Sequence, residues 1–210
     1  MFIVLEGLDK SGKTTQAKLL SSYLKQFNYN VLLLKDPFDQ GVAGEIRKII
    51  LNYSQDPNGI MSRTETLLFN AARAQMVQAH IIPHLLLSLN NVVVCDRFIL
   101  STLAYQVYGN SNFKDEQNIL NIIQYAINDT YPDITIFLDI PPKEIYARRK
   151  DNSYDNIEKR GLEYMEKVYA GYQHYMTRYN VFTVDARKSI DTIHRNIIEI
   201  IRKKSLLILE

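Results

Sequence analysis

The residues best suited to chemistry lie near the N-terminus, where Gly7 to Thr14 fit the pattern G-x-x-x-x-G-K-[ST]. Two glycines let the backbone bend so that successive N–H groups converge on phosphate oxygens, and a following helix adds the positive end of its dipole. Lys13 can reach the β- and γ-phosphates of a nucleoside triphosphate, and the Thr14 hydroxyl can bind Mg²⁺. The spacing therefore predicts a phosphate-binding loop made of Gly7, Leu8, Asp9, Lys10, Ser11, Gly12, Lys13 and Thr14.

A second candidate pair is Asp96-Arg97, which follows the apolar run that ends at Cys95. An acid at the end of a buried strand is the pattern by which phosphate-loop enzymes position Mg²⁺ or its water ligands. Asp96 and Thr14 are therefore the predicted metal site, and the neighbouring Arg97 suits a phosphate. Cys95 is predicted to be inert core, because its surroundings are apolar and no base accompanies it.

The elements that would position these residues are indicated by short apolar runs. Each run is continuously apolar or β-branched, which is typical of strands buried on both faces of a parallel sheet. The runs cover residues 2–5, 31–34, 92–95, 134–138 and 181–184. Acids follow most of them, and the carboxyl ends of parallel strands are where α/β sheets bind ligands. These acids are Glu6, Asp96, Asp139 and Asp185.

Between the runs lie stretches with helical periodicity, at 13–27, 64–89, 115–127, 157–179 and 190–204. Pro83 is expected to kink or restart the second of these helices. Strands that alternate with helices predict an α/β fold, here a doubly wound, five-stranded parallel sheet flanked by helices, of the P-loop NTPase type. A length of 210 residues suits a single domain over 1–210.

Composition limits the class of protein. Apolar residues make up 46% and charged residues 23%, as in soluble globular proteins. The net charge of +2 is too small to indicate nucleic-acid or membrane-surface binding. We expect no signal peptide, because the opening apolar run ends at Glu6, and no stretch approaches the roughly 20 apolar residues of a membrane span. With one cysteine in the chain, we expect a cytoplasmic enzyme without nucleic-acid or membrane partners.

Three segments are similar to motifs of the thymidylate kinase family. Residues 67–75 read LLFNAARAQ and resemble its L-L-F-x-A-x-R-x-Q helix, and residues 96–106 read DRFILSTLAYQ and resemble its D-R-[FY]-x-x-S-x-x-A-Y-Q motif. Val184-Asp185-Ala186, with Ser189-Ile190, resembles its adenine-side segment. The similarity extends through most of the chain. It implies a homodimeric enzyme that phosphorylates dTMP to dTDP with ATP and Mg²⁺, in dTTP synthesis.

The resemblance also implies which residues bind the acceptor nucleotide. Phe69 would stack on the thymine ring, and Arg73 and Arg97 would hold the phosphate and the base edge with their guanidinium groups. Tyr105 would crowd the 2′ position of the sugar, and Asp9 would accept a hydrogen bond from the 3′-hydroxyl. The whole predicted acceptor set is Asp9, Asp36, Phe69, Arg73, Arg97, Ser101, Thr102, Tyr105 and Gln106.

On the donor side, Arg148 would stack on the adenine and Arg187 would bind the same nucleotide. A lid is expected at about 148–158, as in the family. Bacterial members usually have a glycine where this chain has Lys10. They also have several arginines in the lid, and at the position of one of these arginines this chain has Asn156. Lys10 is therefore predicted to supply transition-state charge. The predicted catalytic residues are Lys13, Lys10, Arg97 and Arg149.

Several alternatives remain open from the sequence. Lys35 to Gln40 replace the family's Arg-Glu-Pro-Gly-Gly-Thr, which leaves the shape of that side of the pocket undefined. Phe69 could be plain core, and Arg73 could lie on a solvated helix face. A kinase for another nucleoside or nucleoside monophosphate, or a P-loop regulatory ATPase, is the alternative function. The N-K-x-D motif of GTPases does not occur in the sequence.

Overall fold

The computed structural model describes residues 1–53, 59–147 and 161–204. Its centre is a five-stranded sheet with the order β2-β3-β1-β4-β5, and every neighbouring pair is parallel. The strands are β1 (Phe2–Glu6), β2 (Asn30–Lys35), β3 (Asn91–Asp96), β4 (Ile134–Asp139) and β5 (Val181–Asp185). The strands predicted from the apolar runs are thus confirmed, as is the doubly wound α/β fold.

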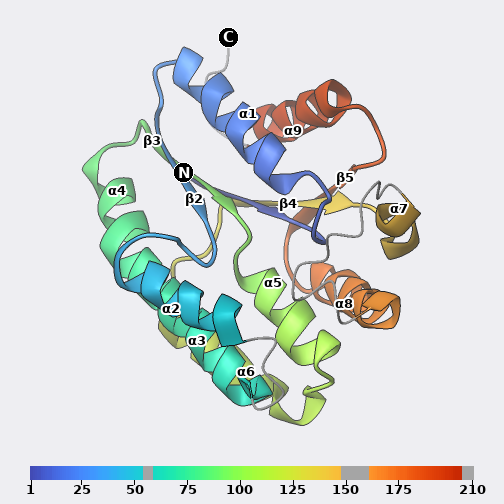
Figure 1. Ribbon diagram of the computed structural model, residues 1–210. Coiled ribbons are helices and arrows are strands. Elements are labelled where there is room, and N and C mark those ends of the chain that lie inside the picture. The colour runs from blue at the N-terminus through green and yellow to red at the C-terminus, as the bar shows by residue number, and fades with distance from the viewer. Residues whose placement is uncertain (54–58, 148–160, 205–210) are drawn as a thin grey trace.

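Helices cover both faces of this sheet (Figure 1). On one face, α1 (Lys13–Gln26) lies beside α9 (Ile190–Lys204), and on the other lie α5 (Ile99–Thr102) and α8 (Gly161–Met176). A group formed by α2 (Gly41–Tyr53), α3 (Ser62–Met76) and α6 (Glu116–Ile127) extends beyond the sheet on the side of α5. None of the helices that the structure describes has the length and apolar character needed to cross a membrane.

The strand register brings the predicted functional residues to one edge of the sheet. Leu5 pairs with Asp96, and Lys35 pairs with the same aspartate from the other side. β1 and β3 are buried along their whole lengths, which explains their unbroken apolar sequences. Glu6, Asp36 and Asp96 therefore meet at the carboxyl ends of three adjacent strands, next to the loop that follows β1.

The long helix predicted over 64–89 consists of three consecutive segments. α3 continues into a π-helix at Val77–Ile81 and then into α4 (Ile82–Leu87), with Pro83 in the first turn of α4. Pro83 was predicted to kink or restart this helix, but the helical course is continuous through it, and the π-helix lies directly before it, where its ring and missing N–H disturb α-helical bonding.

Helix α3 has its polar side toward the protein and part of its apolar side toward solvent. Leu67 is 53% exposed, whereas the polar side chains of Thr66, Asn70 and Arg73 are buried. Periodicity in the sequence groups the apolar residues on one side but does not say which side faces the core. The buried polar side instead forms a wall of the site described below.

Three described helical regions were not predicted. They are α2, the region of α5 with the π-helix Leu103–Gly109 that continues it, and α7 (Pro142–Ala147). The predicted helix over 115–127 is α6, preceded by a 3₁₀ turn at Phe113–Asp115. The helix predicted from residue 157 is described from Gly161 onward as α8, and its earlier residues lie outside the described ranges.

Candidate active site

The loop between β1 and α1 has the backbone geometry that its two glycines allow. Gly12 has φ 96° directly before α1, a left-handed conformation that favours glycine. A Cβ on Gly7 would lie 2.9 Å from the carbonyl oxygen of Leu138, so the close approach of loop and β4 requires glycine there. The predicted phosphate-binding loop thus has the expected strand-loop-helix setting.

Lys13, the first residue of α1, is buried at the centre of this loop. Its Nζ donates a hydrogen bond of 2.6 Å to the carbonyl oxygen of Leu8. Burial, with the nearby positive charge of Arg97, lowers the pKa of Lys13 to about 8. Its ammonium group is therefore inside the loop that would hold phosphates, and it is charged at neutral pH.

The predicted metal site brings together Thr14 and Asp96. The Thr14 Oγ1 donates a hydrogen bond of 2.5 Å to Oδ2 of Asp96. The other carboxylate oxygen, Oδ1, is buried and has no hydrogen-bond partner among the described residues. A hydroxyl and a carboxylate with a free acceptor are hard oxygen donors, which fit Mg²⁺ or one of its water ligands.

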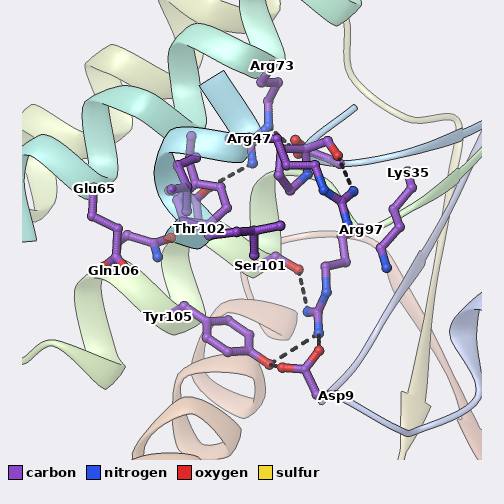
Figure 2. A pocket seen from close by; sticks show the side chains of 15 residues that line it. Asp9, Lys35, Arg47, Glu65, Arg73, Arg97, Ser101, Thr102, Tyr105 and Gln106 are labelled. Carbon is purple, nitrogen blue, oxygen red and sulfur yellow. Dashed lines mark hydrogen bonds and ion pairs between the residues drawn. The ribbon is translucent and has the colours of Figure 1, made fainter. Parts of the chain in front are cut away.

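A cavity of about 250 Å³ adjoins the loop, and every residue predicted to bind the acceptor lines it. Figure 2 shows how side chains from β2, α3 and the region of α5 converge on it. Phe69 is half-buried in its wall, so it is not a plain core residue. The residues that line it are Asp9, Lys35, Asp36, Pro37, Arg47, Ile50, Leu51, Glu65, Phe69, Arg73, Arg97, Ser101, Thr102, Tyr105 and Gln106.

Arg73 lies at one end of the pocket and is only 1% exposed, so the solvated-face alternative is wrong. Its Nε donates to Oδ2 of Asp36 at 2.7 Å, and its Nη2 donates to Oγ1 of Thr102 at 2.8 Å. Burial raises the pKa of Asp36, and the ion pair with Arg73 opposes that rise. Asp36 thus holds Arg73 at the wall of the pocket.

Arg97 lies at the other end of the pocket, beside the phosphate-binding loop. Its Nη2 donates to Oδ1 of Asp9 at 2.5 Å, and the Tyr105 hydroxyl donates to Oδ2 of the same carboxylate at 2.9 Å (Figure 2). Burial alone would raise the pKa of Asp9, but the charges of Arg97 and Lys13 hold it at about 2. Asp9 is therefore an ionised acceptor between the loop and the pocket.

Three charged pocket residues were missed from the sequence: Lys35, Arg47 and Glu65. Arg47 lies on α2, which was not predicted, and its Nη1 donates to the carbonyl oxygen of Pro37 at 2.9 Å. Apolar residues at helical spacing, such as Ile46 and Ile50, could have indicated that helix. Lys35 ends β2 at the pocket, so it and Arg47 add positive charge to this cavity.

Only some of the residues predicted for the donor side lie within the described ranges. Arg187 follows β5 and is exposed, with its Nε 2.7 Å from Oδ1 of Asp185. Lys10 is also exposed and has φ 63°. Arg148, Arg149 and the predicted lid at about 148–158 lie outside the described residues. The donor-binding and catalytic roles of all these residues remain predictions.

Comparison with known proteins agrees with this geometry. The family model described as thymidylate kinase matches residues 5–197. A thymidylate kinase of Finegoldia magna is 36% identical over 99% of this chain and 100% of its own length. One of Exiguobacterium sp. is 38% identical over 95% of this chain and 92% of its own, and one of Thermosipho africanus is 39% identical over 97% and 98%. With a parallel sheet, a phosphate-binding loop and an adjoining pocket in place, the chain belongs to the thymidylate kinase family.

Proposed function

We propose that this chain transfers the γ-phosphoryl group of ATP to dTMP and yields dTDP, a step in dTTP synthesis. The observation that carries the proposal is the contact between Asp9 of the phosphate-binding loop and Arg97 of the pocket. Because these residues touch, a triphosphate in the loop and a nucleotide in the pocket would have their phosphates side by side. Phosphoryl transfer depends chiefly on that alignment and on electrostatic stabilisation.

The loop residues would bind the donor. Lys13 would exchange its bond to Leu8 for the β- and γ-phosphates, and the loop N–H groups would surround them. Thr14 and Asp96 would hold Mg²⁺, which neutralises charge on those oxygens when it is bound. Arg148 and Arg187 are proposed for the adenine end of the same nucleotide.

The pocket would bind the acceptor with its base and its phosphate at opposite ends. Phe69 would stack on the thymine, near the buried Arg73, whose guanidinium suits a carbonyl of the base edge. Arg97, with Arg47 and Lys35 at the same cavity, would bind the phosphate. The ionised Asp9 would accept from the 3′-hydroxyl, and the ring of Tyr105 would oppose a 2′-hydroxyl.

Charge on the phosphoryl group in flight would be stabilised by Lys13, Arg97, Lys10 and Arg149. Lys13 is buried and the side chain of Arg97 is only 12% exposed; both lie at the junction of loop and pocket, where low polarity strengthens their effect. For Lys10 the support is its position in the loop, and for Arg149 it is the resemblance.

We also propose that residues 1–210 form one kinase domain, that two copies form a homodimer, and that the enzyme works in the cytoplasm. The dimer is supported by exposed apolar residues on two helices that pack together: Leu67 on α3 is 53% exposed, and Ile49 on α2 is 44% exposed. A helix with its polar side buried and apolar residues in solvent is typical of an interface. The buried, unpaired Cys95 fits a reducing compartment.

The experiment that tests the function measures ADP release with ATP, Mg²⁺ and each common nucleoside monophosphate in turn. We expect rapid release with dTMP and little without an acceptor. A kinase of the alternative specificity would respond to another nucleotide instead. Release that does not depend on any acceptor would support the regulatory ATPase and refute the proposal.

A further inference from the structure

A buried tyrosine outside the pocket contacts both the phosphate-binding loop and the pocket residues Arg97 and Ser101. Tyr172 of α8 is 0% exposed, and its hydroxyl lies 3.1 Å from Nη1 of Arg97 and 2.8 Å from Oγ of Ser101. The same hydroxyl can donate to Oε2 of Glu6 at 3.1 Å or to the carbonyl oxygen of Gly7 at 3.3 Å. One oxygen atom on α8 thus contacts the end of β1, the phosphate-binding loop and the turn after β3.

Glu6 completes this network as a fully buried carboxylate. Its Oε1 accepts from the backbone N–H of Phe98 at 2.8 Å and of Ser101 at 3.2 Å, and its Oε2 accepts from the Ser101 hydroxyl at 2.6 Å. These bonds fix the turn that carries Arg97. Arg97 has φ 75°, a left-handed conformation that a non-glycine residue keeps only when its surroundings hold it there.

The guanidinium group of Arg97 is also held by hydrogen bonds to this network. Besides Tyr172, its Nη1 faces the carbonyl oxygen of Gly7 at 3.0 Å and the Ser101 hydroxyl at 3.0 Å. Neither Glu6 nor Tyr172 is among the residues that line the pocket. Glu6 and Tyr172 would therefore not touch the acceptor. They contact the turn that carries Arg97, which would touch the acceptor, and Tyr172 also contacts the phosphate-binding loop, which would touch the donor.

We propose that Tyr172 and Glu6 are positioning residues of the kinase reaction, which fix the guanidinium of Arg97 between the phosphate-binding loop and the acceptor's phosphate. The inference rests on the proposed function, since it assigns Arg97 to the acceptor. Buried hydrogen bonds to a charged group restrict its orientation strongly, because a misaligned donor cannot be replaced by water there. Loss of the Tyr172 hydroxyl would release Arg97 on the acceptor side and leave the backbone of the donor loop intact.

The test is Tyr172→Phe in the full chain, with Tyr175→Phe as the matched control. The phenylalanine ring keeps the packing of Tyr172 on Phe137, whose ring centroid is 5.0 Å away. Tyr175 lies on the same helix, is equally buried at 0% exposure, and contacts Tyr108 instead of this network. Both variants therefore remove one buried hydroxyl from α8, but only one removes it from Arg97.

For Tyr172→Phe we expect kcat/KM for dTMP to fall about tenfold or more, and dTMP affinity in calorimetry to weaken with it. Affinity for a non-hydrolysable ATP analogue should change less than about twofold, and Tyr175→Phe should alter neither ligand. Glu6→Gln, which keeps an acceptor for the two N–H groups, should lose less dTMP affinity than Glu6→Ala.

Equal weakening of both ligands by Tyr172→Phe, or kinetics identical to those of Tyr175→Phe, would overturn the inference. Turnover of dTMP by the unaltered enzyme is measured first. Its absence would refute the proposed function, whereas normal turnover with an unaffected Tyr172→Phe variant would refute only the positioning role.

Discussion

At the scale of single residues, the electrostatics of the predicted phosphate-binding loop would determine the pH range in which it binds a triphosphate. Lys13 is surrounded by protein and lies near Arg97, so its pKa is lowered to about 8. Below that pH the free enzyme carries the charge that attracts phosphates, and above it the charge is lost.

This predicts a pH dependence on the donor side. kcat/KM for ATP reports ionisations of the free enzyme, so it should fall as pH rises through about 8, approaching tenfold per pH unit. Bound phosphates favour the charged lysine, so kcat at saturating substrates should fall only at a higher pH. A profile of kcat/KM for ATP between about pH 7 and pH 9.5 checks this, and a flat profile would contradict it.

Tyr105 gives a second prediction, about discrimination between sugars. Its ring lies at the pocket while its hydroxyl donates to Asp9, so the two parts can be tested separately. Tyr105→Ala should lower the ratio of kcat/KM for dTMP to that for UMP by about tenfold or more, because it opens space at the 2′ position. Tyr105→Phe keeps the ring and should preserve the ratio. If Tyr105→Ala leaves the ratio unchanged, the ring does not exclude the 2′-hydroxyl.

Nine residues that line the pocket could be named from the sequence because the motifs around Phe69 and Arg97 resemble a known family. Which residues hold these side chains in place could not be predicted from the sequence. The pair of Arg73 with Asp36 joins residues from different elements, and only the folded chain shows that both are buried. Arg47 was missed for a simpler reason, since α2, the helix that carries it, was not predicted.

At the scale of elements, strands were easier to predict than the orientation of helices. Strands buried on both faces leave continuous apolar runs, and β1 and β3 have them. α3 has apolar and polar sides, but its polar side faces the pocket and Leu67 faces solvent. Periodicity cannot distinguish core from interface, because both bury apolar surface.

The exposed side of α3 predicts the oligomeric state. Leu67→Glu places a charge on the proposed interface and should convert dimers to monomers, as measured by light scattering after size-exclusion chromatography. Leu86→Glu is the matched control, since this leucine of α4 is 81% exposed and lies outside the group of α2 and α3. Dimers that survive Leu67→Glu, or an unaltered protein that is monomeric, would contradict the proposed interface.

At the scale of the whole molecule, β1 organises the enzyme. It is the central strand of the sheet, ends at Glu6 and continues directly into the loop that carries Gly7 and Asp9. The donor loop and the anchors of the acceptor pocket thus share one rigid origin, so two substrates bound on either side of Asp9 would be aligned for transfer.

The central claim is that a phosphoryl group passes from ATP to dTMP at this junction, and following γ-labelled ATP tests it most directly. With the unaltered enzyme, dTMP and Mg²⁺, the label should appear in dTDP. Lys13→Ala, folded by circular dichroism, should transfer almost none, because the charge at the transferring group is gone. Label released as inorganic phosphate at a rate that does not depend on dTMP, or near-normal transfer by folded Lys13→Ala, would contradict the account.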